Sequence, residues 1–243
     1  MKLLPFFTYY GGKWRAAPHY PPPQCDTIIE PFAGAAGYSV RYPEKQVVLV
    51  EKDATIAALW RYLISATESD IKALPLIRLD QSVDDLDICA EAKSLIGFWV
   101  NKGSASPRKT PSAWMRGGTR PKSYWGPEIR DRIANQVSSI AHWRVIEGDY
   151  STAPDIEATW FIDPPYSEAG RLYRHSSKDL DFDALALWCR ARSGQVLVCE
   201  NEGANWLPFT PFREIQANQS SRGKGTSKES LWINQTRNLR ESH

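Results

Sequence analysis

Four short apolar runs, each followed by an acidic residue, constrain the fold of this chain more than any other feature of its sequence. They lie at residues 27–29, 47–50, 159–162 and 195–199, and each is followed by Glu or Asp. Continuous apolar runs of this length are typical of strands that are buried on both faces of a parallel sheet. Ligands bind at the carboxyl ends of such strands, so the acidic residues there become site candidates.

Segments with helical spacing of apolar side chains lie between these runs. In residues 54–65, Ile56 and Leu59 recur at helix spacing, and residues 182–192 have the same character. Strands that alternate with helices predict right-handed βαβ units, and therefore an α/β fold with helices on both faces of the sheet. A last apolar run at residues 230–233 predicts a hairpin at the end of that sheet.

The alternation of strands and helices lapses between residues 67 and 143. Residues 103–127 are rich in Gly, Ser, Pro, Arg and Trp, a composition that suits a loop-rich surface unit better than a sheet core. We therefore expect one catalytic domain in two parts, residues 1–66 and 144–243, with an inserted segment at 67–143.

The inserted segment carries opposite charges in its two halves. Residues 67–91 are acidic, whereas residues 101–127 contain no Asp or Glu. The basic residues of the second half are Lys102, Arg108, Lys109, Arg116, Arg120 and Lys122. Because the net charge is only +2, an anionic partner must be held by such a local cluster, and Lys and Arg mainly contact phosphates. Trp114, Tyr124 and Trp125 lie among them and either enter a nucleic acid or anchor a small core.

The composition predicts a soluble protein of a bacterial or phage-infected cytoplasm. The sequence has no apolar run of about eighteen residues, the length that a membrane span needs, and residues 1–5 are too short for a signal peptide. The cysteines are scattered, without a Cys-x-x-Cys pair. We therefore interpret Cys25, Cys89, Cys189 and Cys199 as reduced core thiols, and we expect no metal site.

The strongest chemical signal is Asp163-Pro164-Pro165-Tyr166, which directly follows the third apolar run. Two prolines end the strand, remove two amide donors and fix the backbone, so that carbonyl groups can face a cleft. Such a tetrapeptide suits a planar heterocycle with an exocyclic amine. Asp163 and the Pro164 carbonyl can accept the two N–H bonds of that amine, while Tyr166 stacks on the ring. An ordinary strand stop is the other interpretation, because Asp-Pro often starts a turn.

A turn with two glycines, residues 30–37, follows the first apolar run and reads Glu-Pro-Phe-Ala-Gly-Ala-Ala-Gly. Glycines let a backbone approach a ligand closely, and such turns open nucleotide-binding folds. No Lys-Ser/Thr pair follows, which excludes a phosphate-cradling P-loop. Glu51 lies about twenty residues past the start of the turn, where a carboxylate usually binds ribose hydroxyls.

The order of these motifs resembles the Dam-type (D12 class) family of DNA adenine-N6 methyltransferases, and a phage or prophage member is one expectation. In that family a Gly-Gly-Lys motif, a Pro-Phe-x-Gly loop, an inserted target-recognition region and an Asp-Pro-Pro-Tyr motif occur in this order. The corresponding residues here are 9–13, 30–37, 67–143 and 163–166, and the likeness continues into the tail at 229–234.

The resemblance implies a Rossmann-like methyltransferase sheet, S-adenosylmethionine as cofactor, site-specific methylation of adenine N6 and double-stranded DNA as partner. Lys13 would hold the methionine carboxylate, Glu51 the ribose, and Asp149 the cofactor adenine. The implied cofactor-binding residues are Tyr9, Gly12, Lys13, Glu30, Phe32, Gly34, Gly37, Glu51, Asp149 and Asp163, and the implied catalytic residues are Asp163, Pro164, Pro165 and Tyr166. Two departures from the family pattern are Tyr9 at a usual Trp and Gly-Ala-Ala-Gly at a usual Gly-x-Gly.

A second basic segment follows the catalytic motif. Its aromatic and basic residues, Arg171, Tyr173 and Arg174, are predicted to close on a flipped base and its backbone. His175 is either part of that contact or an ordinary surface histidine. The resemblance also makes a cognate restriction enzyme a candidate partner.

Other functions remain open at this point. An RNA adenine methyltransferase would use the same amine-binding motif, since that motif does not touch the sugar that carries the base. A cytosine-N4 enzyme is disfavoured by Asp163, because Ser is frequent at this position in that class. A nonenzymatic DNA-binding module on a degenerate Rossmann scaffold is disfavoured by the intact Lys13, Glu51 and Asp163. A nicotinamide dehydrogenase lacks a candidate for hydride chemistry near the glycine turn.

Overall fold

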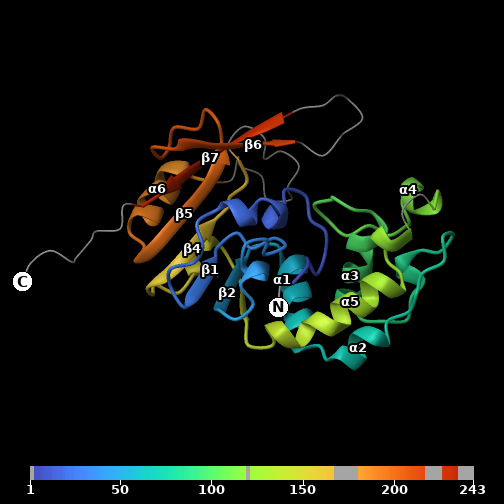
Figure 1. The fold of residues 1–243 in the computed structure, drawn as a ribbon. Coiled ribbons are helices and arrows are strands. Elements are labelled where there is room, and N and C mark those ends of the chain that lie inside the picture. Colours follow the sequence, from blue (N-terminus) through green and yellow to red (C-terminus); the bar gives the residue numbers. More distant parts are fainter. Residues whose placement is uncertain (1–2, 119–120, 167–179, 217–225, 235–243) are drawn as a thin grey trace, which may run out of the picture.

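The computed structural model describes residues 3–118, 121–166, 180–216 and 226–234, and a sheet of seven strands forms its centre (Figure 1). The strands are β1 (Thr27–Glu30), β2 (Gln46–Glu51), β3 (Arg144–Glu147), β4 (Ala158–Ile162), β5 (Gly194–Asn201), β6 (Thr210–Gln216) and β7 (Thr226–Ile233). Their order is β3-β2-β1-β4-β5-β7-β6. The pairs among β1 to β5 are parallel, whereas β7 is antiparallel to both β5 and β6. This order with an antiparallel β7 confirms the predicted α/β fold class, the Rossmann-like methyltransferase sheet.

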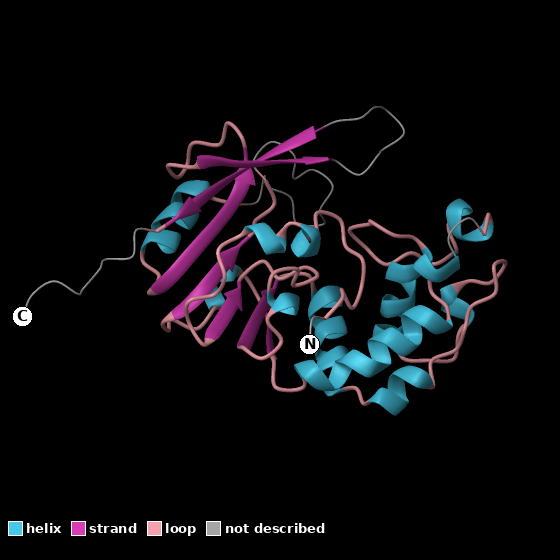
Figure 2. Ribbon diagram, viewed as in Figure 1, coloured by secondary structure: helices cyan, strands magenta, loops and turns pink. Residues whose placement is uncertain are grey.

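Helices cover both faces of the sheet, as Figure 2 shows for α1 and α6. The helices are α1 (Ala54–Ser65), α2 (Glu68–Lys72), α3 (Ala90–Val100), α4 (Ala113–Arg116), α5 (Pro127–Val137) and α6 (Phe182–Arg190). Side chains of a strand alternate between faces, so Leu49 of β2 packs in the apolar cluster that contains Ile56 of α1, while Val50 packs in the cluster with Leu185 of α6. Each strand in the middle of the sheet is therefore apolar on both faces.

Helix α1 begins just after the carboxyl end of β2. The Asp53 carboxylate caps the helix by accepting the Thr55 N–H at 2.8 Å, which satisfies one of its unpaired first-turn amides. Trp60 is fully buried on this helix, and its indole N–H donates to the Gly34 carbonyl at 2.8 Å. The helix thus fixes the turn that follows β1.

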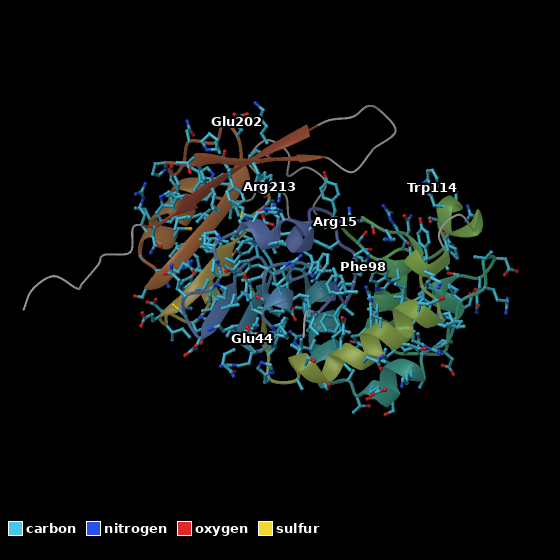
Figure 3. The ribbon with its side chains drawn as sticks, viewed as in Figure 1. Arg15, Glu44, Phe98, Trp114, Glu202 and Arg213 are labelled. Atoms are coloured by element: carbon cyan, nitrogen blue, oxygen red, sulfur yellow. The ribbon has the colours of Figure 1, made fainter. Side chains whose placement is uncertain are left out.

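The inserted segment is more helical than its composition predicts. Most of residues 103–127 is loop, as expected, with the short α4 and a 3-10 turn, but α3 and α5 flank this loop. Trp125 is buried and its indole N–H donates to the Pro75 carbonyl at 2.9 Å, so it anchors the core, whereas Trp114 on α4 is 72% exposed (Figure 3). Apolar residues of α3 and α5 belong to the same cluster as those of α1. The division at residues 67 and 143 stays a prediction.

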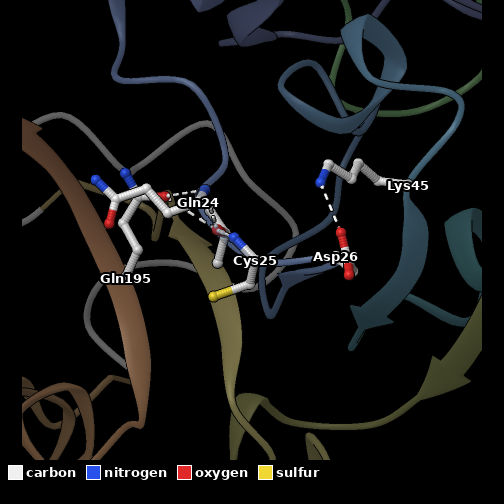
Figure 4. A network of polar contacts seen from close by, with 6 residues as sticks. Gln24, Cys25, Asp26, Lys45 and Gln195 are labelled. Carbon is white, nitrogen blue, oxygen red and sulfur yellow. Dashed lines mark hydrogen bonds and ion pairs between the residues drawn. The ribbon is translucent and has the colours of Figure 1, made fainter.

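Polar contacts hold the proline-rich strap before β1 against the amino ends of two strands (Figure 4). The backbone N–H of Gln24 donates to the Thr159 hydroxyl and to the Gln195 side-chain carbonyl, both at 3.0 Å. The Gln195 amide group in turn donates to the Pro22 carbonyl at 3.2 Å. These bonds lie at the amino ends of β4 and β5, opposite the carboxyl ends of the parallel strands.

The prediction that all four cysteines are core thiols is wrong for two of them. Cys189 and Cys199 are buried, but Cys25 is half-buried and Cys89 is exposed. Cys89 precedes α3 as its N-cap, and helix ends commonly lie at the surface. None of the helices in the described part of the chain combines the length and the apolar character that a membrane crossing requires.

Candidate functional site

A cleft opens at the carboxyl ends of β1, β2 and β4, and it unites residues that lie far apart in the sequence. All ten residues that the resemblance implies for cofactor binding line it: Tyr9, Gly12, Lys13, Glu30, Phe32, Gly34, Gly37, Glu51, Asp149 and Asp163. Pro165 of the catalytic motif also lines the cleft, while Pro164 and Tyr166 are not among the lining residues. Three of the four strand-end carboxylates, Glu30, Glu51 and Asp163, therefore meet at one end of the sheet, as parallel strands allow. The fourth, Glu200, is buried, accepts the Trp206 indole N–H at 3.1 Å and is not among the lining residues.

The turn after β1 has a backbone that glycine permits. Gly34 has a φ of 45°, and its N–H donates to the Glu51 carboxylate at 2.9 Å. Ala36 has a φ of 49°, a left-handed conformation that costs a residue with a side chain about 1–2 kcal/mol. This is the position at which the family pattern is broken, and the buried turn holds Ala36 in that conformation.

Gly37 lets the turn approach the segment that carries Lys13. A Cβ at this glycine would lie 2.5 Å from the Trp14 nitrogen and 2.8 Å from the Lys13 nitrogen. Both are backbone atoms, which cannot move aside without displacing the chain. The absence of a side chain at Gly37 is therefore what brings the N-terminal segment to the cleft.

Glu30 is a buried acid at the carboxyl end of β1. Its Oε1 accepts the Ser39 N–H at 2.7 Å, and the side chain also lines the cleft. Burial raises the pKa of Glu30 to about 8, because the bond from Ser39 offsets only part of the cost of a charge in this place. The group is therefore largely a neutral acid at pH 7 until a cation approaches it.

Glu51 at the end of β2 already has two backbone donors. Its Oε2 accepts the Gly34 N–H at 2.9 Å, and its Oε1 accepts the Asp53 N–H at 2.8 Å. Burial raises the pKa of Glu51, and these bonds oppose the shift. A carboxylate has about four acceptor positions, so the oriented Glu51 can still accept a bond from a hydroxyl group.

The other end of the cleft is aromatic and acidic. Asp149 accepts the Ser151 N–H at 3.2 Å, and its carboxylate lies 3.6 Å from the Lys52 ammonium. Phe32 and Tyr150 stack beside it, with ring centroids 5.6 Å apart. Tyr150 lines the cleft and was not predicted as a site residue, although it is adjacent to Asp149.

A buried ion cluster links the catalytic motif to the N-terminal segment and to β7. The Lys13 ammonium lies 3.0 Å from the Asp163 carboxylate and 2.9 Å from the Glu229 carboxylate, and it also donates to the Tyr166 hydroxyl. The Tyr166 hydroxyl donates to Glu229 Oε1 at 3.0 Å. An ammonium has three N–H donors, so these three acceptors match its full capacity.

Burial and charge shift the titration of this cluster. Burial raises the pKa of Asp163 to about 6, although the Lys13 ammonium opposes the shift. Burial disfavours the charge on Lys13, but the carboxylates of Asp163 and Glu229 outweigh it and hold its pKa well above the ordinary value. Burial also raises the pKa of the Tyr166 hydroxyl. At pH 7 the Lys13 cation therefore lies beside a mainly ionised Asp163 and a neutral Tyr166 phenol.

Glu229 was not predicted to have a role, although it is the first residue of the tail motif at 229–234. Its side chain is only 2% exposed. Acidic residues are almost never fully buried unless they are paired, so a single Glu just before an apolar strand was a usable signal. The signal was ambiguous because one residue of register decides whether a strand side chain faces the core.

The predicted DNA-binding residues do not line the cleft as far as the structure describes them. Lys109 pairs with Asp84 at 2.6 Å, Lys102 lies over the rings of Trp99 and Tyr124, and Arg116 donates to a backbone carbonyl. Arg108 and Lys122 are exposed. Four more predicted residues, Arg120, Arg171, Tyr173 and Arg174, and also His175, lie outside the described residues. The DNA-binding roles stay predictions.

Comparisons with known proteins found distant structural likenesses and no match by sequence. No protein-family model matches the chain, and no curated protein matches it either. Among solved structures, a "conserved hypothetical protein" of Streptococcus pyogenes is 12% identical, with a TM-score of 0.36 and 86% of each chain covered. A "putative RNA methyltransferase" from Pyrococcus horikoshii is 10% identical, with a TM-score of 0.38, and the match covers 94% of this chain and 80% of that one. A "putative methylase" from Haemophilus influenzae is 12% identical, with a TM-score of 0.34 and coverage of 86% and 78%. At these scores the names carry no argument about what this chain acts on.

Proposed function

We propose that this protein is a site-specific methyltransferase that transfers a methyl group from S-adenosylmethionine to the N6 amine of adenine in double-stranded DNA. The observation that carries the proposal is the position of the Asp163 carboxylate. It lies at the end of β4 in the same cleft as the turn after β1 and the Glu51 carboxylate. An amine acceptor and a candidate cofactor site thus share one cavity.

The residues of the cleft fit S-adenosylmethionine along its length. Glu30 is a buried acid that can receive the methionine ammonium, and Glu51 is oriented to accept ribose hydroxyls. Phe32 and Tyr150 offer aromatic surface beside Asp149, which can accept an adenine amine. When bound, the cofactor supplies an electrophilic methyl group. Lys13 also lines the cleft, and it can hold the methionine carboxylate if that group replaces one of the three acceptors that Lys13 already has.

The chemical problem in this reaction is that the adenine amine is a poor nucleophile, because its lone pair is delocalised into the ring. Asp163 accepts an N–H of the amine, favouring the geometry that frees the lone pair. This hydrogen bond strengthens as positive charge develops on the nitrogen, so it stabilises the transition state more than the ground state. Asp163 is mainly ionised at pH 7, since its pKa is about 6. It can accept the proton that the methylated amine releases.

The target adenine must leave the base stack to reach this cleft, since an amine inside a duplex is out of reach of a bound cofactor. The exposed Arg108 and Lys122 of the inserted segment are candidates for phosphate contacts that position the duplex. A cognate restriction enzyme stays a candidate partner within this proposal.

The test is methyl transfer from labelled S-adenosylmethionine to duplex DNA and, in parallel, to RNA, followed by digestion and identification of the labelled nucleoside. The proposal expects labelled N6-methyl-2′-deoxyadenosine from DNA and none with Asp163→Ala. Label in RNA alone would make the protein an RNA adenine methyltransferase. Label in cytosine would contradict the adenine assignment. DNA binding without transfer would favour a nonenzymatic module.

A further inference from the structure

We propose that Glu229 is a positioning residue, which shares the Lys13 ammonium so that Asp163 keeps its strength as an acceptor for the target amine. This inference rests on the proposed function. It concerns a residue in the tail motif that is far from the catalytic motif in the sequence, and it gives the antiparallel β7 a part in the chemistry.

The sheet brings Glu229 to the cluster. In β7 it pairs with Asn201 at the carboxyl end of β5, the strand next to β4 and its Asp163. From there Glu229 Oε1 accepts both the Lys13 ammonium, at 2.9 Å, and the Tyr166 hydroxyl, at 3.0 Å. One carboxylate oxygen thus binds the two side chains that also contact or flank Asp163.

The charge balance explains why a second carboxylate is needed. If Asp163 were the sole counter-charge of Lys13, the pair would be neutral, and the ammonium would compete with the substrate amine for the Asp163 oxygens. With Glu229 the cluster carries one positive and two negative charges. The remaining negative charge favours a cationic nitrogen at the amine position, and it acts in a buried site where charges interact more strongly than in water.

Among the described residues whose charge acts on Asp163 itself, Lys13 is the cation, whereas Arg213 of β6 lies opposite Glu229 in the β6–β7 register and lines a second pocket with it. Lys13, Glu229 and Tyr166 influence Asp163 most, Glu30 of the same cleft also interacts with it, and Tyr20 and Cys199 lie close enough to interact with the cluster as neutral groups. Glu229 therefore has a defined effect on its neighbour. Its negative charge raises the pKa of Asp163, so that its removal lowers this pKa.

The experiment compares Glu229→Gln with the wild type and with Glu202→Gln. Glu202 (Figure 3) is a matched control, because it is a half-exposed glutamate that follows β5 and pairs with Lys228 of β7 at 3.2 Å. For Glu229→Gln we expect single-turnover methylation to fall by about 10- to 100-fold, the range for loss of one charged hydrogen bond, with unchanged affinity for S-adenosylmethionine. The acidic limb of the rate moves below its wild-type position near pH 6. Glu202→Gln behaves as wild type.

A carbon-13 NMR titration of the Asp163 carboxyl reads the same coupling without substrate. Its pKa falls in Glu229→Gln and stays unchanged in Glu202→Gln. If Glu229→Gln does not fold, Glu229→Asp replaces it in the rate measurements, because this variant keeps the negative charge. It should lose part of the rate, with the acidic limb near its wild-type position. A wild-type rate or an unmoved Asp163 pKa in Glu229→Gln overturns the inference. A wild-type protein that methylates no adenine overturns the proposed function instead, and the NMR titration still decides on Glu229.

Discussion

The titration of Glu30 makes a quantitative prediction about cofactor binding. Its pKa is about 8 in the free protein, so it is mostly protonated at pH 7. The α-amino group of a methionine moiety has a pKa of roughly 7.7–8.0 and is mostly protonated at pH 7 as well. Pairing the two as carboxylate and ammonium therefore requires Glu30 to release its proton.

The magnitude follows from linkage. Each pH unit below the Glu30 pKa adds about 1.4 kcal/mol to the cost of deprotonation, which is about a tenfold loss of affinity. Between about pH 7.5 and 6.5 the dissociation constant of S-adenosylmethionine should thus rise several-fold to tenfold, with release of nearly one proton per cofactor at the lower pH. Glu30→Gln keeps an acceptor for the Ser39 N–H but has no proton to release. Its affinity should be lower at pH 7.5 and nearly constant over this range.

Calorimetry in two buffers of different ionisation enthalpy counts the released protons directly. The range stays above the Asp163 pKa of about 6, so Asp163 contributes little. A wild-type affinity that does not change between these pH values, with no proton released, would refute the role of Glu30 as the partner of the ammonium. The same slope in Glu30→Gln would assign the proton to another group.

Three further predictions concern the rest of the site. The single-turnover rate should fall about tenfold per pH unit below pH 6, because a protonated Asp163 has lost the negative charge that favours a cationic amine. A rate that stays constant down to about pH 5 would contradict this prediction. Gly37→Ala should lower the free energy of unfolding by about 1–3 kcal/mol in denaturant titrations and reduce methyl transfer, because its new Cβ would clash with backbone atoms. In the control Gly126→Ala the nearest atom to the new Cβ is 3.7 Å away, so stability and transfer should stay at the wild-type level. Neutralising both Arg108 and Lys122 should lower the log–log salt slope of DNA binding by about 0.9 per lost phosphate contact, and an unchanged slope would move the footprint elsewhere.

The sequence predicted the sheet well where burial is complete. Strands β1, β2, β4 and β5 and helix α1 lie where apolar runs and helix spacing indicated them. Two strands, β3 and β6, were not predicted from the sequence, and the reason is physical. Strand β3 is an edge strand without a single fully buried residue, so its four residues have no continuous apolar run. Strand β6 is the other edge, and its sequence Thr-Pro-Phe-Arg-Glu-Ile-Gln is mixed.

The inserted segment and the ion cluster mark the limits of reading the sequence alone. Helices α3 and α5 pack into the apolar cluster of α1. The buried residues of α3 spread around the helix, so its local pattern is weak and tertiary contacts stabilise it, whereas Ile129, Ile133 and Val137 of α5 recur at helix spacing and were a usable signal. The cleft residues were identified by motif order. Glu30, Glu51, Asp149 and Asp163 lie at or just after strand ends that the fold fixes, whereas the motif at residues 9–13 precedes the first strand. Glu229 was missed because its contact with Lys13 spans most of the chain and depends on the register of β7. The Glu beside the apolar run at 230–233 was a usable signal for a buried acid, but no local pattern identifies Lys13 as its partner.

The most direct test of the central claim is single-turnover methylation of an adenine-containing duplex by wild type, Asp163→Asn and Asp163→Ala, with cofactor affinity measured in parallel. Asn keeps the shape and one acceptor but lacks the negative charge. If Asp163 acts by electrostatic stabilisation of the developing cation, both variants lose about two to three powers of ten in rate while they still bind S-adenosylmethionine and DNA. Near-wild-type rates in both variants would contradict the mechanism and would leave Asp163-Pro164-Pro165-Tyr166 as an ordinary end to a strand.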